Sequence, residues 1–381
     1  MYKRQIYFTL FLPSGPAPAH GWPVALFGHG LGDNKNAGPW TVAAILAQQG
    51  VATAAINVVG HGFGPAGTLE IGLLGGGSAT VSAGGRAVDQ NGDGQYGAFE
   101  GVQALPPYEI VAVRDGLQQT VADLMRLVRA IEGGVDVDGD GQRDLDASRI
   151  YSVGQSFGGI YGTMLMAVEP NLGAGVANAF GGSIVEAERL GTFRPLLTQA
   201  LALRTPSLLN LPGGFAEDLP LRDQPPLVDP VAGALPIQEL LDRTEWVSQP
   251  ANAASYAPHL RTAPLSGVPK KSMLFQFAKG DQTVPNPTAT AVLRAGHFAD
   301  RATYFRNDLA FAADPTVPKN PHSFLTRINV PSVAAVAFGT QRQIATFLSS
   351  NGTVIVDPDG AGPLLEVPIA GPLPEDLAFI P

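Results

Sequence analysis

Residues 149–162 read RIYSVGQSFGGIYG. An apolar, partly β-branched run ends at Gly154, and a helix-compatible tail follows Gly159. A serine hydroxyl is a poor nucleophile unless it is lifted clear of the chain within reach of a base, and a tight strand-to-helix turn does this. Only glycine, which has no Cβ, fits two positions before and two after such a serine. The pattern predicts a nucleophile turn at Ser156, and the alternative is a glycine-rich turn with an ordinary serine.

The composition is that of a compact globular protein. Apolar residues make up 45% of the 381 residues and charged residues 15%, which argues against disorder. The length suits one large α/β domain with insertions or two ordinary domains. A net charge of −9 offers no basic surface for nucleic acid. The lack of cysteine excludes disulfides, thiolate metal sites and a cysteine nucleophile.

The start of the chain gives no targeting signal. The sequence has no run of about 18 apolar residues, and a strand-like segment begins close to residue 5, so neither a membrane span nor a signal peptide is expected in it. Residues 1–5, MYKRQ, resemble adapter read-through at the end of an assembled reading frame. The chain is therefore expected to begin mid-domain, and the lack of a signal peptide in it says little about the location of the protein.

Strand and helix signals alternate along most of the chain, which is the pattern of an α/β fold with a doubly wound, mostly parallel sheet. Besides the strand that leads into Ser156 and the helix that follows it, strands are expected at 6–12, 22–27, 51–59, 174–180, 271–278 and 303–305. Helices are expected at 41–49, 111–132, 287–299 and 332–349.

The composition changes in two places along the chain. Residues 60–110 are rich in glycine and are interpreted as an insertion, and residues 183–265 hold leucine- and proline-rich helical pieces that are interpreted as a cap over the site. The core is then expected to consist of a first part, 1–182, and a second part, 266–381.

A serine nucleophile needs a base, which is usually an imidazole because its pKa lies near operating pH. The sequence has six histidines. His29 and His61 precede the nucleophile in His-Gly turns, His259 lies in the expected cap, and His297 lies inside the expected helix 287–299. His322, on a proline-rich loop after the last expected strand, is the predicted base, and a surface-loop histidine is the alternative interpretation.

The acid that orients the base should follow a strand between the nucleophile and the base. Asp281, directly after the expected strand 271–278, fits this position, and Asp308 and Asp314 are the reserves. An N-cap or turn aspartate is the alternative interpretation of Asp281. The order Ser156, Asp281, His322 is the chain order of α/β-hydrolases.

Acyl transfer also requires backbone donors for the oxyanion. One is expected to be the N–H of Phe157, directly after the nucleophile, and the other to lie in an early loop after a strand. Residues 28–31, GHGL, supply that loop, so the second donor is predicted to be the N–H of Leu31. The alternative is that these glycines only form a tight turn.

These motifs together resemble those of α/β-hydrolases: GHG at 28–30, GQSFGG at 154–159, GDQTVP at 280–285 and the late His322. More narrowly, the chain resembles bacterial extracellular lipases and esterases of the virulence-factor lipase type, which carry similar acidic loops before the nucleophile strand. The resemblance covers most of the chain outside 183–265. It implies a carboxylic-ester hydrolase, whereas the residues themselves indicate acyl transfer from a serine.

Residues 89–100, DQNGDGQYGAFE, match the template of a calcium-binding loop, with oxygen ligands at positions 1, 3 and 5, glycine at 6, a carbonyl at 7 and glutamate at 12. A solvated acidic turn is the alternative. The expected Ca²⁺ ligands of this first loop are Asp89, Asn91, Asp93, Gln95 and Glu100.

Residues 136–144, DVDGDGQRD, repeat the first half of this template. Position 12 is Ala147, so Asp144 or Asp146 would have to replace the missing carboxylate. Neither loop has two good flanking helices, which favours structural sites over switches, and modest affinity suits the millimolar calcium outside cells or at their surface. The expected ligands of this second loop are Asp136, Asp138, Asp140, Gln142 and Asp144.

The sequence favours a serine carboxylesterase or lipase that forms an acyl-enzyme on hydrophobic esters, since a large apolar cap suits such substrates. A polyester (cutinase-like) depolymerase and a serine peptidase are the alternatives among hydrolases. A non-catalytic, calcium-stabilised binding module on the same fold is the alternative from a different class of protein.

Overall fold

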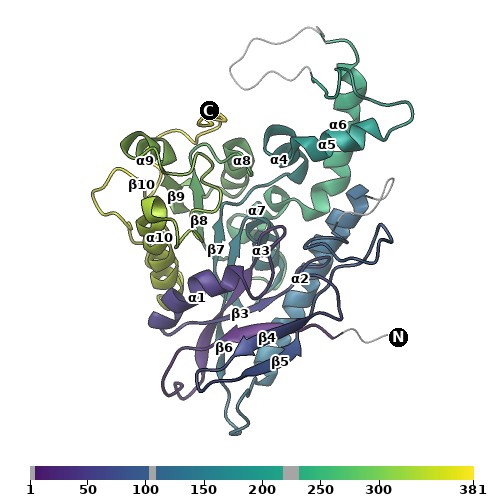
Figure 1. Ribbon diagram of the computed structural model, residues 1–381. Coiled ribbons are helices and arrows are strands. Elements are labelled where there is room, and N and C mark those ends of the chain that lie inside the picture. Colours follow the sequence, from purple (N-terminus) through teal and green to yellow (C-terminus); the bar gives the residue numbers. More distant parts are fainter. Residues whose placement is uncertain (1–4, 103–108, 218–230) are drawn as a thin grey trace.

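The computed structural model describes residues 5–102, 109–217 and 231–381 (Figure 1). Its strands are β1 (Phe8–Phe11), β2 (Trp22–Gly28), β3 (Ala52–Ile56), β4 (Thr68–Gly72), β5 (Ser78–Ser82), β6 (Leu145–Gln155), β7 (Leu172–Asn178), β8 (Ser272–Ala278), β9 (Ala302–Phe305) and β10 (Leu365–Glu366). Its helices are α1 (Gly38–Gln48), α2 (Glu109–Gly133), α3 (Phe157–Val168), α4 (Ile184–Leu190), α5 (Arg194–Ala202), α6 (Ala234–Ser248), η1 (Gln249–Ala251), α7 (Ala253–Arg261), α8 (Asn286–Gly296), η2 (Ala299–Arg301), α9 (Asn307–Ala313) and α10 (Pro331–Ser349). No helix in these ranges has both the length and the apolar character needed to cross a bilayer.

Eight strands form one sheet in the order β1-β3-β2-β6-β7-β8-β9-β10. The six inner strands are parallel to one another, whereas β1 pairs antiparallel with β3, and β10 pairs antiparallel with β9. The expected doubly wound, mostly parallel α/β sheet is therefore confirmed. Parallel neighbours end at the same edge, so the loops that follow β2, β6, β7 and β8 meet there.

Strand β2 shows how the sequence builds a layer of helices on each face of the sheet. Val24 and Leu26 belong to the core that includes α2, α3, α7 and α8. Ala25 and Phe27 point the opposite way, into the core shared with α1 and α10. Successive side chains of a strand alternate between faces, so a strand buried on both faces is apolar at every position. Figure 1 shows α1 and α10 side by side, away from α2.

Two expectations about local structure are wrong or incomplete. The helix expected at 287–299 ends at Gly296, and His297 is its C-cap with φ +57°, a left-handed conformation that ends a helix. His297 therefore lies beyond the helix and not inside it. The glycine-rich insertion at 60–110 also contains the antiparallel hairpin β4–β5, while its residues 103–108 lie outside the described part of the chain.

The segment 183–265, which is predicted to form a cap, supplies helices α4 to α7. Helices α5 and α6 stand above the end of the sheet (Figure 1), and this region has a small core of its own, made of Val185, Leu197, Leu201, Phe215, Ile237 and Leu241. Helix α7 differs, because its buried residues belong to the main core and it packs on α3 and α8. Residues 218–230 of the segment lie outside the described part. The cap stays a prediction that concerns α4 to α6.

Lys271 connects the end of α3 to the sheet. The residue is 5% exposed, and its ammonium donates hydrogen bonds to the carbonyl oxygens of Glu169 at 2.8 Å, Pro170 at 3.0 Å and Leu172 at 2.9 Å. Burial lowers the pKa of Lys271 to about 8. The three bonds stabilise the connection between α3 and β7, and the desolvation of the ammonium offsets part of this gain.

We expect Lys271→Met to lower the free energy of unfolding by about 2–4 kcal/mol, because three buried carbonyl oxygens would lose their donor. Urea denaturation at pH 7 measures this change. The control is Lys270→Met at the exposed neighbouring position, which should shift stability by no more than about 0.5 kcal/mol. Equal effects of the two substitutions would show that the bonds of Lys271 contribute nothing to stability.

Candidate active site

Ser156 lies at the turn between β6 and α3. Its backbone has φ +58° and ψ −122°, which L-residues rarely adopt. The N–H of Ser156 donates a hydrogen bond of 2.8 Å to the carbonyl of Asn178 at the end of β7, and this bond holds the turn against the neighbouring strand. The turn places the hydroxyl at the N-terminus of α3, at the edge of the sheet where the parallel strands end.

The two glycines that flank Ser156 are required by close backbone contacts. A Cβ on Gly154 would collide with the carbonyl of Gly158, and a Cβ on Gly158 would collide with the carbonyl of Gly28 in β2. The G-x-S-x-G spacing therefore reflects two separate contacts, one within the turn and one between α3 and β2. This is the physical basis of the pattern from which the nucleophile turn is predicted.

The structure brings together the three side chains that are predicted to form the triad. Ser156 Oγ–H donates a hydrogen bond of 2.7 Å to His322 Nε2, and His322 Nδ1–H donates one of 2.8 Å to Asp281 Oδ2. The exposed fractions are 8% for Ser156 and His322 and 1% for Asp281. The arrangement forms a continuous path by which a proton can leave the hydroxyl and a carboxylate can stabilise the imidazolium.

Asp281 is held in place from its other side. Its Oδ1 accepts hydrogen bonds from the N–H groups of Thr283 at 2.8 Å and Val284 at 2.9 Å, which leaves Oδ2 directed at the imidazole. The reserve candidates are engaged elsewhere, because Asp308 forms ion pairs with two basic side chains and Asp314 accepts hydrogen bonds within its own turn.

Asn320 joins the loop of the base to the loop of the acid, and the sequence analysis missed it. Its Oδ1 accepts hydrogen bonds from the N–H groups of His322 and Gln282, both at 3.2 Å. Its Nδ2 donates to Thr283 Oγ1 at 2.9 Å. An amide two residues before a candidate base is a weak signal in sequence, since its partner loop lies about 40 residues away.

The two early histidines lie behind the predicted oxyanion loop. His29 and His61 are fully buried with ring centres 5.4 Å apart, and His61 stacks on Phe157 at 5.9 Å. Burial lowers the pKa of both imidazoles, that of His29 to about 3. His29 Nε2 accepts a hydrogen bond from the N–H of Val58 at 3.1 Å. Both rings are therefore neutral packing elements that support the loop and the ring of Phe157.

The predicted oxyanion donors lie on the same side of the nucleophile. Leu31 and Phe157 both line a cavity that also contains Ser156. Within the described ranges, neither the N–H of Leu31 nor that of Phe157 has a hydrogen-bond acceptor. Both N–H groups are thus free to donate a hydrogen bond to a ligand in this part of the molecule.

Two cavities of different character adjoin Ser156. The larger, of about 390 Å³, contains His322, and its wall combines apolar side chains with one carboxyl group, that of Asp33, and the hydroxyl groups of Thr41, Thr283, Ser323 and Thr326. The smaller, of about 60 Å³, lies on the side of Phe157, and its wall is apolar apart from Ser156 and Glu188. The two sides of the nucleophile therefore offer different chemistry to the two halves of a substrate.

The first acidic loop is organised around its first and last carboxylates. Asp89 accepts hydrogen bonds from the N–H groups of Gly92 and Gly94 at 2.7 and 2.9 Å. Glu100 accepts them from Gln90 and Gly97 at 3.0 and 2.9 Å. The carboxylate at position 12 therefore joins the start of the loop to its end.

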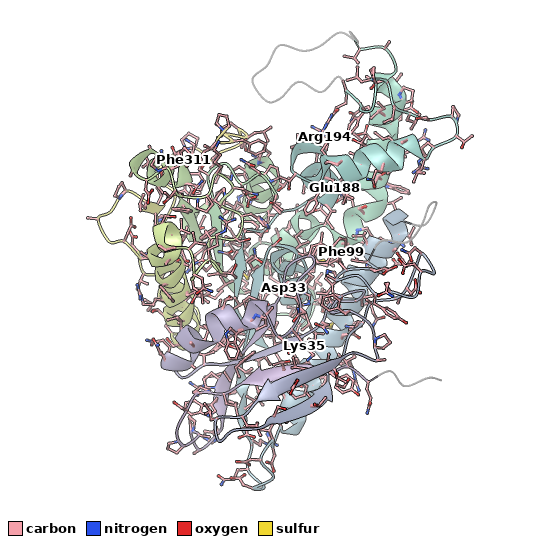
Figure 2. All side chains as sticks on the ribbon, in the orientation of Figure 1. Asp33, Lys35, Phe99, Glu188, Arg194 and Phe311 are labelled. Atoms are coloured by element: carbon pink, nitrogen blue, oxygen red, sulfur yellow. The ribbon has the colours of Figure 1, made fainter. Side chains whose placement is uncertain are left out.

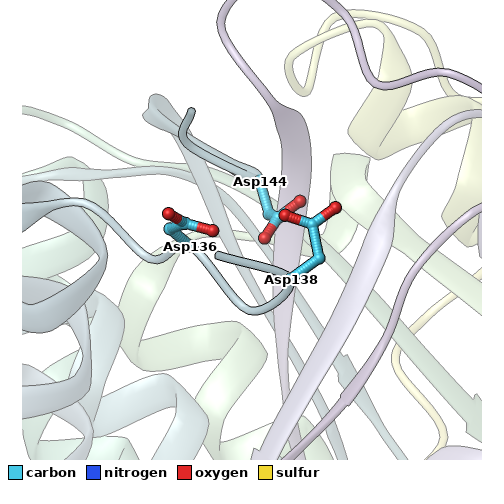
Figure 3. Close-up of side chains that lie close together, drawn as sticks. All are labelled: Asp136, Asp138 and Asp144. Carbon is cyan, nitrogen blue, oxygen red and sulfur yellow. The ribbon is translucent and has the colours of Figure 1, made fainter. Parts of the chain in front are cut away.

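The second acidic loop has the same backbone pattern. Asp136 accepts from the fourth and sixth N–H groups of the loop, and Asp144 accepts from the N–H of Val137 at 2.7 Å, the second position. Asp144 thus takes the role that Glu100 has in the first loop, whereas Asp146 bonds to Ser148 and Arg149 instead. The carboxylates of Asp136, Asp138 and Asp144 have oxygens within 4.8 Å of one another (Figure 3).

No protein-family model matches the chain, and no curated protein matches it. Similar solved structures include a monoacylglycerol lipase from Paleococcus ferrophilus, with 14% identity, coverage of 91% of this chain and 100% of that chain, and a TM-score of 0.43. An acylaminoacyl peptidase from Pyrococcus horikoshii has 10% identity over 94% of this chain and 42% of that one, with a TM-score of 0.49. Acetyl xylan esterase 1 from Thermoanaerobacterium has 13% identity over 76% and 69%, with a TM-score of 0.38. The α/β arrangement of this chain is shown by its own strand order, and a strand-to-helix turn carries Ser156.

Gly158→Ala should lower the free energy of unfolding by about 1–3 kcal/mol, because the new methyl group must push α3 away from β2. Gly116→Ala is the matched control, since it lies within α2 at ordinary contact distance from its neighbours and should be neutral or stabilising by about 0.5–1 kcal/mol. Urea denaturation of the two variants measures both values. If Gly158→Ala is as stable as the wild type, the proposed close contact with Gly28 does not exist.

Proposed function

We propose that this protein is a serine hydrolase of carboxylic esters that acts through an acyl-enzyme. The observation that supports this most directly is the pair of hydrogen bonds that links Ser156 through His322 to Asp281. The N–H groups of Leu31 and Phe157, which have no acceptor in the described part of the chain and belong to residues that line a cavity with Ser156, support the same proposal as donors for the oxyanion.

In the proposed reaction, Ser156 Oγ attacks the ester carbonyl while His322 Nε2 takes the hydroxyl proton. The negative charge on the carbonyl oxygen is stabilised by the N–H groups of Leu31 and Phe157, and Asp281 stabilises the imidazolium. His322 then gives the proton to the leaving alcohol oxygen as the carbon–oxygen bond breaks. Water hydrolyses the acyl-enzyme by the same steps in reverse, with His322 as the base.

Proton transfer assigns the two cavities to the two halves of the ester. The leaving oxygen must approach His322, so the alcohol occupies the larger polar cavity and the acyl group occupies the smaller one beside Phe157. The cavity beside Phe157, of about 60 Å³, is much smaller than the cavity that contains His322, of about 390 Å³. We therefore propose a preference for short acyl groups and polar alcohols, within the ester hydrolases.

We expect Ser156→Ala to lower kcat on p-nitrophenyl butyrate by at least about 10⁴-fold, because no other group can form the acyl-enzyme. The release of p-nitrophenol measures the rate, and Ser349→Ala at the exposed end of α10 is the control. A fluorophosphonate should label the wild type at Ser156 and leave Ser156→Ala unlabelled.

Wild-type turnover in Ser156→Ala would remove this serine from the mechanism. A wild-type protein that neither hydrolyses esters nor reacts with the fluorophosphonate would support the non-catalytic binding module instead. A lipase of the virulence-factor type and a polyester depolymerase both require that ester hydrolysis depends on Ser156.

We also propose that both acidic loops bind Ca²⁺ as structural ions. Hard cations take oxygen ligands, and each loop offers several carboxylates together with a backbone carbonyl at its seventh position. The shared backbone pattern, with Glu100 and Asp144 in equivalent roles, supports one ion in each loop. Sites of this kind suit the calcium concentrations outside cells, so we propose a secreted or cell-surface location.

Calcium at 1 mM should raise the melting temperature of chelator-treated protein by about 3 °C or more, because an ion that binds only the folded state stabilises it. Glu100→Gln and Asp144→Asn should each remove part of this increase, while Asp115→Asn on α2 should not. Differential scanning fluorimetry with and without the chelator measures the shift. An unchanged melting temperature on addition of calcium would identify both loops as solvated acidic turns.

A further inference from the structure

One carboxyl group lies in the wall of the small cavity beside the nucleophile. Glu188, on α4, lines this cavity together with Ser156 and Phe157. Figure 2 shows Glu188 between Asp33 of the sheet body and Arg194 of the helices above it. Burial raises the pKa of Glu188 to about 7. Among the residues that the structure describes, its carboxyl has no hydrogen-bond or ion-pair partner.

The basic side chains near Glu188 are already paired with other acids. Arg189 forms ion pairs with Glu186 at 2.9 Å and with Glu217 at 3.5 Å. Arg194 pairs with Glu217 at 2.7 Å. Glu188 is thus left in an apolar wall, where an unpaired carboxyl group lowers stability relative to an apolar side chain of the same size. Such a group gains most from a ligand that brings its own hydrogen-bonding group.

We propose that Glu188 binds a hydroxyl group on the acyl part of the substrate, so that the enzyme prefers hydroxyacyl esters to plain alkanoyl esters. This inference rests on the proposed function, because it needs the acyl group to occupy the cavity on the side of Phe157. Glu188 is then a specificity-determining residue, and it takes no part in the proton transfers at Ser156.

A hydroxyl group suits this wall better than an ammonium or an alkyl group. A hydroxyl can donate to the ionised carboxylate and can accept from the protonated carboxyl, so it pairs with both forms that exist near neutral pH. An ammonium would bring three donors to one acceptor group, because the other lining side chains, among them Val102, Val113, Ile160 and Val284, are apolar. An alkyl chain would leave the carboxyl group desolvated and without a partner.

The experiment compares kcat/KM for methyl butyrate with kcat/KM for methyl 2-hydroxybutyrate and methyl 3-hydroxybutyrate, measured by pH-stat at constant pH. In the wild type, at least one hydroxylated ester should exceed methyl butyrate. Glu188→Leu and Glu188→Ala both remove the carboxyl group, and each should lower the ratio of hydroxylated to plain ester at least about tenfold. The ratio is unaffected by a general loss of folded enzyme, which would lower all three rates together.

Glu186→Gln, on the same helix and outside the cavity, should leave the ratio as it is in the wild type. The inference is overturned if the wild type prefers methyl butyrate to both hydroxylated esters, or if a folded Glu188 variant keeps the wild-type ratio within about twofold. A wild type that hydrolyses none of the three esters and resists the fluorophosphonate overturns the proposed function itself. If one of Glu188→Leu and Glu188→Ala does not fold, the other decides the outcome.

Discussion

The close approach of α3 to β2 is the constraint on which the candidate active site depends. Gly158 packs against the carbonyl of Gly28, and this contact fixes where α3 begins relative to the sheet. The turn before the helix then holds Ser156 at φ +58°, a conformation that costs about 1–3 kcal/mol and persists only where its surroundings impose it. This turn places Oγ at the N-terminus of α3, where free N–H groups and the helix dipole both favour negative charge.

His322 and Asp281 reach Ser156 because the sheet is parallel. Strands β6, β7 and β8 end at one edge, so residues more than 100 positions apart in the chain meet there. The final adjustment comes from local bonds: Thr283 and Val284 hold one oxygen of Asp281, and Asn320 holds the loop that carries His322. The positions of Asp281 and His322 are thus set by backbone N–H groups and by the side-chain amide of Asn320, none of which takes part in the proposed proton transfer.

The features that the sequence predicted well are those that depend on local chemistry. Apolar runs predicted the inner strands. The glycines around Ser156 indicated a turn, and the structure shows that their close backbone contacts exclude a Cβ. Two residues whose partners lie far away in the chain were missed. Glu188 on α4 lines a cavity beside Ser156, and Asn320 joins the loop of His322 to the loop of Asp281. Composition also hid the β4–β5 hairpin within the insertion. For the second acidic loop the sequence left Asp144 and Asp146 as alternatives to a carboxylate at position 12, and the hydrogen bond from the N–H of Val137 favours Asp144.

The two sides of the nucleophile share one electrostatic property despite their different walls. Partial burial raises the pKa of Asp33 in the larger cavity and of Glu188 in the smaller one, so a partly buried carboxyl group lines each cavity. An anionic group on either half of a substrate would be repelled by the ionised form of the carboxyl group that lines its cavity. In the proposed mechanism, neutral esters enter such a site more readily than anionic ones. The same repulsion favours release of the carboxylate product, since hydrolysis creates a negative charge next to Glu188 where the neutral ester had none.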